Sequence, residues 1–138
     1  MPKRKKKLYI AYGSNLNLAQ MARRCPDAEI AGSAELTGYR LRFCGGRMSA
    51  VATIEPDDGY SVPVLIWRIS ERDERSLDIY EGYPRLYRKE TLLVSMEGRK
   101  RRTRAMVYVM NTNGRDYGVP SDGYYHSILE GYHSSGFD

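Results

Sequence analysis

The feature that most constrains the fold of this chain is a succession of short strand-like runs separated by turn residues. Val, Ile, Leu, Tyr and Thr gather in these runs, while Gly, Pro, Asn and Asp mark the breaks between them. This pattern favours an α+β fold, built on a small mixed β-barrel or strongly bent sheet with a few peripheral helices. The expected strands are Leu8–Ala11, Glu29–Leu36, Tyr39–Phe43, Ala50–Glu55, Val62–Ile69, Lys89–Met96 and Thr103–Met110.

Three helices are expected, each after a residue that can cap it. Asn17 precedes the first, and Ser121 precedes the third. Ser70 and Asp73 form a capping-box pattern before the second. Gly131 is expected to end the third helix. The expected helices are Leu18–Arg24, a segment reaching Tyr80 or Glu81, and Asp122–Glu130; the expected turns are Thr37-Gly38, Gly45-Gly46, Pro56–Gly59, the hairpin tip Glu97–Lys100 and a loop holding Asn113-Gly114.

The positive net charge of +5 comes from two short segments. Residues 3–7 and 99–104 each contain five Lys or Arg side chains. Without these ten, twelve basic residues remain against 17 acidic ones, so the rest of the chain is mildly acidic. We therefore expect a basic, disordered tail over residues 1–7, a solvated hairpin tip and one domain over residues 8–138. Nucleic acid is not the expected partner, because nucleic-acid binding usually needs a basic face across the folded surface; a salt-sensitive contact through both segments is the alternative.

The 138-residue chain is long enough to bury a hydrophobic core. It shows no sequence features of a membrane, secreted or metal-binding protein. It has no apolar run of ~18 residues and no signal-peptide core, so neither a membrane span nor secretion is expected. Cys25 and Cys44 lack metal-ligand spacing, and His126 and His133 have no acidic partners at such spacing. We expect a cytoplasmic protein without metal or cofactor; the sequence leaves open whether it is a monomer or a homodimer.

Two motifs indicate chemistry. The strand Leu8–Ala11 runs directly into the turn Tyr12-Gly13-Ser14-Asn15-Leu16, whose clustered backbone N–H groups can bind a carboxylate or a developing oxyanion. Glu81 is followed at once by Gly82, and soon by a proline, as at a helix end. An amide-lined turn and one placed carboxylate suffice for an acyl-transfer site. From spacing alone, the turn could equally be an ordinary helix cap, and Glu81 a solvated side chain.

Together these motifs resemble the gamma-glutamylcyclotransferase family, in the order Tyr9–Leu16 and then Leu77–Gly82. Tyr87-Arg88-Lys89, the strand Ala105–Met110 and the C-terminal helix are also similar, so the resemblance extends over about 130 residues. It implies a cofactor-free enzyme with a mixed barrel, acting on a small γ-glutamyl substrate. The α-amine of the γ-glutamyl group would attack its own side-chain carbonyl, releasing 5-oxoproline and an amine or amino acid.

The resemblance also assigns roles to residues. It places the catalytic carboxylate on Glu81, and the substrate loop on Tyr12, Gly13, Ser14, Asn15 and Leu16. Tyr108 matches a position near the pocket, where its phenol could orient the glutamyl group, although packing in a strand is the simpler role. Asp78 is expected to be structural. The alternative to an enzyme is a non-catalytic module on the same scaffold that binds a small carboxylate or docks a partner.

The chemistry asks for one group that both removes and returns a proton. The attacking amine is protonated at neutral pH, and the departing amine leaves poorly unless it receives a proton. A carboxylate between the two nitrogens could act as base and then as acid. At a helix C-terminus the pKa of Glu81 should rise, because the helix dipole disfavours its ionised form there.

Overall fold

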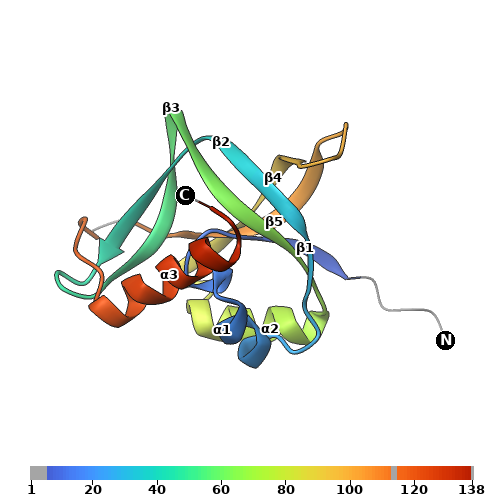
Figure 1. Cartoon of the computed structure of the whole chain (residues 1–138). Coiled ribbons are helices and arrows are strands. Elements are labelled where there is room, and N and C mark those ends of the chain that lie inside the picture. The colour runs from blue at the N-terminus through green and yellow to red at the C-terminus, as the bar shows by residue number, and fades with distance from the viewer. Residues whose placement is uncertain (1–5, 113–114, 138) are drawn as a thin grey trace.

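The protein is a closed five-stranded barrel with three α-helices beside it, which confirms the α+β barrel prediction (Figure 1). The computed structural model describes residues 6–112 and 115–137. The strand order around the barrel is β1-β3-β2-β4-β5, and β1 and β5 close it as a parallel pair, with Tyr9 opposite Met106. The elements are β1 (Lys7–Ala11), the 3₁₀ turn η1 (Ser14–Leu16), α1 (Leu18–Arg24), β2 (Glu29–Gly45), β3 (Ala50–Ile69), α2 (Glu71–Glu81), β4 (Tyr87–Met96), β5 (Thr103–Met110) and α3 (Asp122–Ser134).

The prediction of four separate strands between residues 29 and 69 is wrong, because they form two long ones. β2 and β3 pair antiparallel along nearly their whole length. The expected turns at Thr37-Gly38 and Pro56–Gly59 lie across from each other, and the pairing shifts register between Thr37 and Tyr39. Gly38 and Gly59 have positive φ angles of 82° and 92°. Their freedom lets both strands bend together at a β-bulge instead of ending. The bend is visible at the top of Figure 1.

The helix starts are confirmed, and one helix end is not. Asn17 caps α1, and Ser70 and Asp73 form a complete capping box at α2. α3 runs past Gly131 to Ser134. A Cβ at Gly131 would lie 2.6 Å from the Cβ of Leu16, so this glycine permits close packing of α3 on η1 and does not end the helix.

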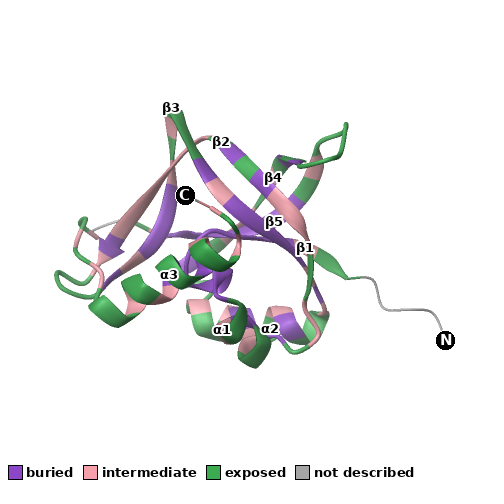
Figure 2. Ribbon diagram, in the orientation of Figure 1, coloured by how far each residue is buried: buried purple, intermediate pink, exposed green. Residues whose placement is uncertain are grey.

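Two hydrophobic clusters share the core. The first joins strand residues to Ile128 of α3, and the second joins strand residues to Met21 of α1 and Leu77 of α2. Figure 2 shows where the buried residues lie along these elements. Alternate side chains of β1 enter different clusters, Ile10 the first and Tyr9 and Ala11 the second, as the two faces of a strand require. The end of β1 therefore lies where both clusters and the helices meet.

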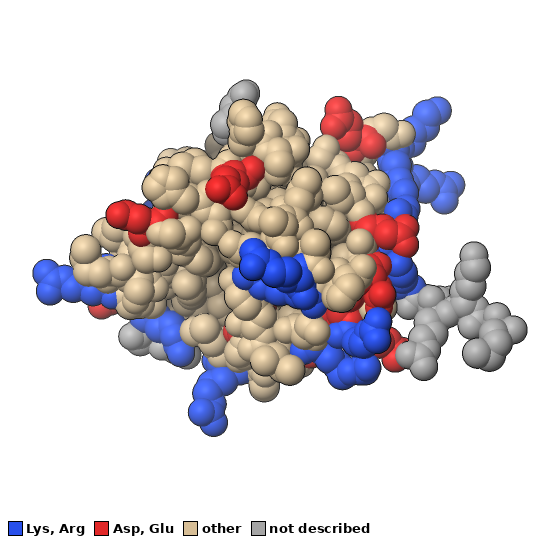
Figure 3. All heavy atoms as spheres, turned by 60° about the horizontal axis from the view of Figure 1, so that its bottom comes forward, with Lys and Arg blue, Asp and Glu red and all other residues tan. Residues whose placement is uncertain are grey.

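The two basic segments differ in their surroundings. Lys7 begins β1, and Lys6 forms an ion pair with Glu29. The remainder of the predicted tail, residues 1–5, and the Asn113-Gly114 loop lie outside the described residues. The tip between β4 and β5 is an exposed hairpin end, as predicted. In Figure 3 basic and acidic side chains are interspersed over the visible face.

Candidate active site

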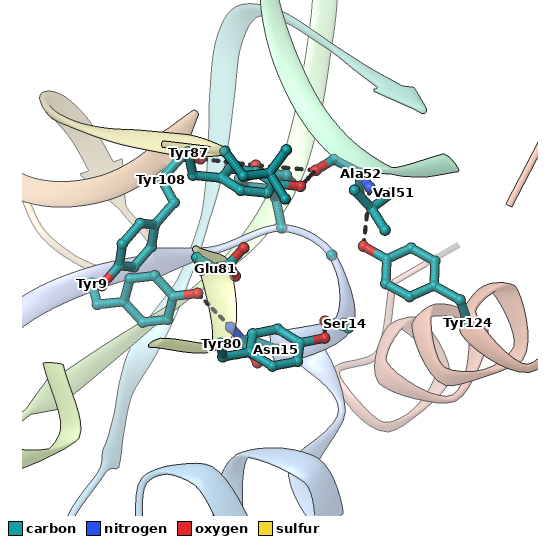
Figure 4. A pocket seen from close by; sticks show the side chains of 13 residues that line it. Tyr9, Ser14, Asn15, Val51, Ala52, Tyr80, Glu81, Tyr87, Tyr108 and Tyr124 are labelled. Carbon is teal, nitrogen blue, oxygen red and sulfur yellow. Dashed lines mark hydrogen bonds between the residues drawn. The ribbon is translucent and has the colours of Figure 1, made fainter. Parts of the chain in front are cut away.

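A cavity of about 230 Å³ lies where the end of β1 meets η1, the last turn of α2 and α3 (Figure 4). Half of the twelve tyrosines in the chain line it. The lining residues are Tyr9, Tyr12, Gly13, Ser14, Asn15, Val51, Ala52, Tyr80, Glu81, Leu86, Tyr87, Tyr108 and Tyr124.

The structure brings Glu81 and the Gly13–Asn15 turn into this one cavity, as the sequence predicts. Glu81 is the last residue of α2, and Gly82 caps the helix in the left-handed conformation at φ 64°. Its side chain points into the cavity in Figure 4. Gly13 lies against β3, where a Cβ would come within 3.1 Å of the Cβ of Ala52. The glycine therefore lets the turn form one wall of the cavity.

Glu81 is the lining group best suited to exchange a proton near neutral pH. Burial raises its pKa to about 7, and the positive charge of Arg24 opposes that rise. Within the described part of the chain, its carboxylate makes no hydrogen bond or ion pair. Burial also raises the pKa of the phenols of Tyr9, Tyr12 and Tyr87, which therefore stay protonated at neutral pH.

The turn is fastened to α1 and α2 through polar side chains. The hydroxyls of Ser14 and Tyr80 are 2.9 Å apart, and the guanidinium of Arg24 lies 3.6 Å from the centre of the Tyr80 ring. Asn15 is buried, and it donates to the Tyr9 hydroxyl at 2.8 Å and accepts from Arg24. Both ends of the Asn15 amide are thus used within the protein, so its side chain fixes the shape of the turn.

The backbone of Ala52 fixes three more lining tyrosines. Its carbonyl accepts hydrogen bonds from Tyr87 at 2.5 Å and from Tyr12 at 3.5 Å, and its N–H donates to Tyr124 at 3.0 Å. Tyr12 also donates to the carbonyl of Tyr108 at 2.8 Å. These bonds join strands β3, β4 and β5 to α3 around the cavity, which sets its shape.

Tyr108 lines the cavity, and its hydroxyl is bonded to Asp78, which does not line it. The hydroxyl donates to Asp78 at 2.5 Å, and the ring packs edge-on against Tyr9. Asp78 also pairs with Lys89 at 2.9 Å, and Lys89 pairs with Glu74 at 2.7 Å. Asp78 therefore has the structural role that the sequence predicts, holding α2 against β4 and β5.

One predicted site residue lies elsewhere. Leu16 is fully buried in the core beneath α3 and does not line the cavity, whereas the other six predicted residues do. Sequence reasoning missed seven lining residues. The excess of Tyr over Phe and Trp was the one available signal, since a polar-tipped ring suits a wet cavity. The missed residues are Tyr9, Val51, Ala52, Tyr80, Leu86, Tyr87 and Tyr124.

Two features are absent from residues 6–112 and 115–137. No helix there is long and apolar enough to cross a membrane. No group of three or more His, Cys, Asp or Glu side chains there is placed to hold a metal ion.

Known proteins resemble this chain in both sequence and fold. The family model described as "Gamma-glutamyl cyclotransferase, AIG2-like" matches residues 9–127. A Mus musculus protein named "Gamma-glutamylcyclotransferase" is 37% identical in an alignment of 82 residues that covers 54% of this chain and 44% of that protein. The match thus covers less than half of the mouse protein's length.

Solved structures extend the similarity over nearly the whole chain. A structure named "Gamma-glutamyl cyclotransferase" superposes with a TM-score of 0.86 at 27% identity, covering 96% of this chain and 81% of the other. An uncharacterized Homo sapiens protein superposes with a TM-score of 0.81 at 26% identity, covering 96% and 82%. The fold, the match over residues 9–127 and the two motifs agree: this chain belongs to the gamma-glutamyl cyclotransferase, AIG2-like family.

Proposed function

We propose that this protein is a γ-glutamyl cyclotransferase, which converts a γ-glutamyl amide into 5-oxoproline and a free amine or amino acid. One observation carries the proposal. Glu81, with a pKa raised to about 7 by burial, stands in a tyrosine-lined cavity beside the turn of Gly13, Ser14 and Asn15. The family match and the names of its relatives favour this enzyme over a non-catalytic binding module on the same scaffold.

In the proposed reaction Glu81 moves one proton between two nitrogens. The α-amine of the substrate loses a proton to the Glu81 carboxylate and attacks the γ-carbonyl carbon, forming the ring C–N bond. As the tetrahedral intermediate collapses, the original amide C–N bond breaks, and Glu81 returns the proton to the departing nitrogen. A carboxyl with a pKa near neutrality suits both steps. Ring closure is intramolecular, so alignment of the bound substrate can supply up to ~7–11 kcal/mol of the barrier reduction.

The turn after β1 is the proposed anion-binding wall. No described residue accepts a hydrogen bond from the backbone N–H of Ser14 or Asn15, because these begin the short η1 helix. In our proposal they bind the oxyanion of the intermediate or the substrate carboxylate, with Tyr12 completing the wall. Tyr108 contributes its ring to the glutamyl site and not its hydroxyl, which Asp78 holds.

The decisive experiment measures 5-oxoproline released from a panel of γ-glutamyl compounds. We expect Glu81→Gln to bind substrate and to lower turnover by about 10²–10⁴-fold, the range typical of a lost general acid–base. Glu71→Gln, an exposed change in the first turn of the same helix, is the control and should match the wild type. Equal turnover in Glu81→Gln and the wild type would remove Glu81 from the mechanism.

We also propose a cytoplasmic setting. Both Cys25 and Cys44 are free thiols in buried positions. Free thiols fit a reducing compartment, where disulfides are rare.

A further inference from the structure

A second cavity adjoins the candidate active site, and the mechanism above does not use it. Its volume is about 600 Å³, and it shares Val51 and Leu86 with the first cavity. It lies between the turn that links β2 to β3 and the segment after β5. Three charged residues line it, Arg47, Arg115 and Asp116.

The first cavity is small for a substrate site. At about 230 Å³ it is smaller than the ~300–1,000 Å³ of a typical small-molecule site. A γ-glutamyl group placed with its amine and carbonyl near Glu81 leaves the departing part of the substrate to project outward. The second cavity could therefore hold the departing part of the substrate if that part points toward it.

Hydrogen bonds tie other parts of the lining of the first cavity together. The Ser14 hydroxyl contacts that of Tyr80, and Tyr124 is bonded to the backbone of Ala52. Val51 and Leu86 are half-buried, apolar and without such bonds. The two cavities adjoin at these two side chains.

The second cavity is built on backbone held in place from both sides. Gly45 N–H donates to the carbonyl of Asp116 at 3.0 Å, and Val119 N–H donates to that of Arg47 at 3.1 Å. The Arg115 guanidinium donates to the carbonyl of Asn111 at 2.7 Å. These bonds join the two segments that carry the arginines, so the site exists before a ligand binds.

The charge of this cavity favours an anion. Among the described residues, neither Arg47 nor Arg115 forms an ion pair, and Asp116 is the single carboxylate in the lining. The neighbouring Arg42 is already paired with Glu55 at 3.5 Å. Two guanidiniums against one carboxylate leave a net positive lining, and guanidinium is well matched to a carboxylate ligand.

We propose that this second cavity binds the leaving group of the substrate, and that Arg47 and Arg115 select γ-glutamyl compounds whose leaving group carries a carboxylate. These are γ-glutamyl amino acids or peptides, as opposed to γ-glutamyl amines. The proposal rests on the cyclotransferase function proposed above, and it adds a specificity site to it.

The test compares two substrates of equal size that differ in charge, γ-glutamyl-alanine and γ-glutamyl-alaninamide. We expect the wild type to prefer the first by about tenfold or more in kcat/KM, the scale of one charged hydrogen bond. Arg47→Gln and Arg115→Gln should each remove most of that preference by raising KM for γ-glutamyl-alanine alone. Arg101→Gln, at the exposed β4–β5 tip, is the matched control.

The outcomes separate the two proposals. Equal kcat/KM for both compounds in the wild type, or an equal loss for both in the two variants, would overturn the leaving-group site while the cyclotransferase stands. If no 5-oxoproline forms from either compound, calorimetric binding of both to Glu81→Gln still decides the site. Tighter binding of the carboxylate compound, lost in Glu81→Gln/Arg47→Gln, supports the site, and equal binding overturns it.

Discussion

At the scale of single residues, the protein combines one unpaired carboxyl with a wall of phenols that are bonded elsewhere. Glu81 lacks a hydrogen-bond partner among the described residues, whereas Tyr12, Tyr87 and Tyr108 each donate to the protein. The phenols thus hold the shape of the cavity, and Glu81 stays available for proton transfer.

The raised pKa of Glu81 predicts a pH-dependent cost to stability. Between its ordinary value of 4.5 and about 7, the folded protein keeps a proton that the unfolded chain has lost. The free energy of unfolding therefore falls as pH rises through this window, and the loss persists above it. We expect Glu81→Gln to be more stable than the wild type by about 1–3 kcal/mol at pH 8 and no more stable at pH 4. Urea unfolding at both pH values measures this, and a difference independent of pH would contradict it.

Tyr108 offers a test of whether its hydroxyl or its ring matters. Tyr108→Phe removes the bond to Asp78 and keeps the ring in the cavity wall. We expect the free energy of unfolding to fall by about 1–2 kcal/mol and kcat/KM to stay within about threefold of the wild type. Denaturant unfolding and steady-state kinetics measure the two, with the exposed Tyr60→Phe as control. A large rise in KM at unchanged stability would show that the hydroxyl binds substrate.

The sequence could reveal Glu81 and the turn because each sits in a local motif. Gly82 marks the helix end, and the strand before Tyr12 marks the turn. Tyr124 gave no such sign, because its partner Ala52 lies 72 residues away. Contacts of that range follow from the fold and not from the neighbouring residues.

At the scale of elements, three glycines that were expected to end a strand or a helix lie within one. Gly38 and Gly59 let β2 and β3 bend without ending, and Gly131 lets α3 pack on Leu16. A glycine in sequence signals that the backbone needs freedom or space. The sequence alone does not say which of the two it is, so the strand breaks and the end of α3 were predicted wrongly.

The packing of α3 on η1 should be sensitive to one methyl group. A Cβ at Gly131 would meet the Cβ and the backbone carbon of Leu16 at 2.6 and 2.7 Å, which leaves no space without a shift of the turn. We expect Gly131→Ala to lower stability by about 1–3 kcal/mol and to reduce turnover, because η1 borders the cavity. Thermal unfolding and 5-oxoproline release measure these effects.

A matched control lies on the same helix. An added Cβ at Gly123 would have no neighbour within 4 Å. Gly123→Ala should therefore be neutral or stabilising by up to about 1 kcal/mol, because alanine favours the helix. If both variants lost stability equally, the contact with Leu16 would not be the cause, because helix propensity favours alanine at both positions.

At the scale of the whole molecule, the presence of a barrel can be predicted from sequence, but the order of its strands cannot. The alternation of strands predicted a barrel, but the order β1-β3-β2-β4-β5 depends on long-range pairing that no local pattern encodes. β2 and β4 meet through only two residue pairs, Ala34 with Met96 and Glu35 with Ser95. A strand pairing this short cannot be predicted from the sequence and is found only in the structure.

The exposed basic tip of the β4–β5 hairpin should not make the protein a nucleic-acid binder. Basic and acidic side chains are interspersed over the face that Figure 3 shows, without a continuous basic surface. We expect fluorescence anisotropy to detect no binding to single- or double-stranded DNA or RNA between about 50 and 200 mM salt. Binding that weakens steeply with salt, and that disappears when Arg99, Arg101 and Arg102 are changed to Ser, would contradict this.

The spread of the cavity lining along the chain bears on how the protein is made. Tyr9 comes near the start, and Tyr124 belongs to the last helix. Synthesis proceeds from the N-terminus, so a chain still attached to the ribosome would lack one wall until α3 had emerged. Activity should then appear only after α3 has emerged, and a product cut short before Tyr124 should be inert even if its barrel had formed.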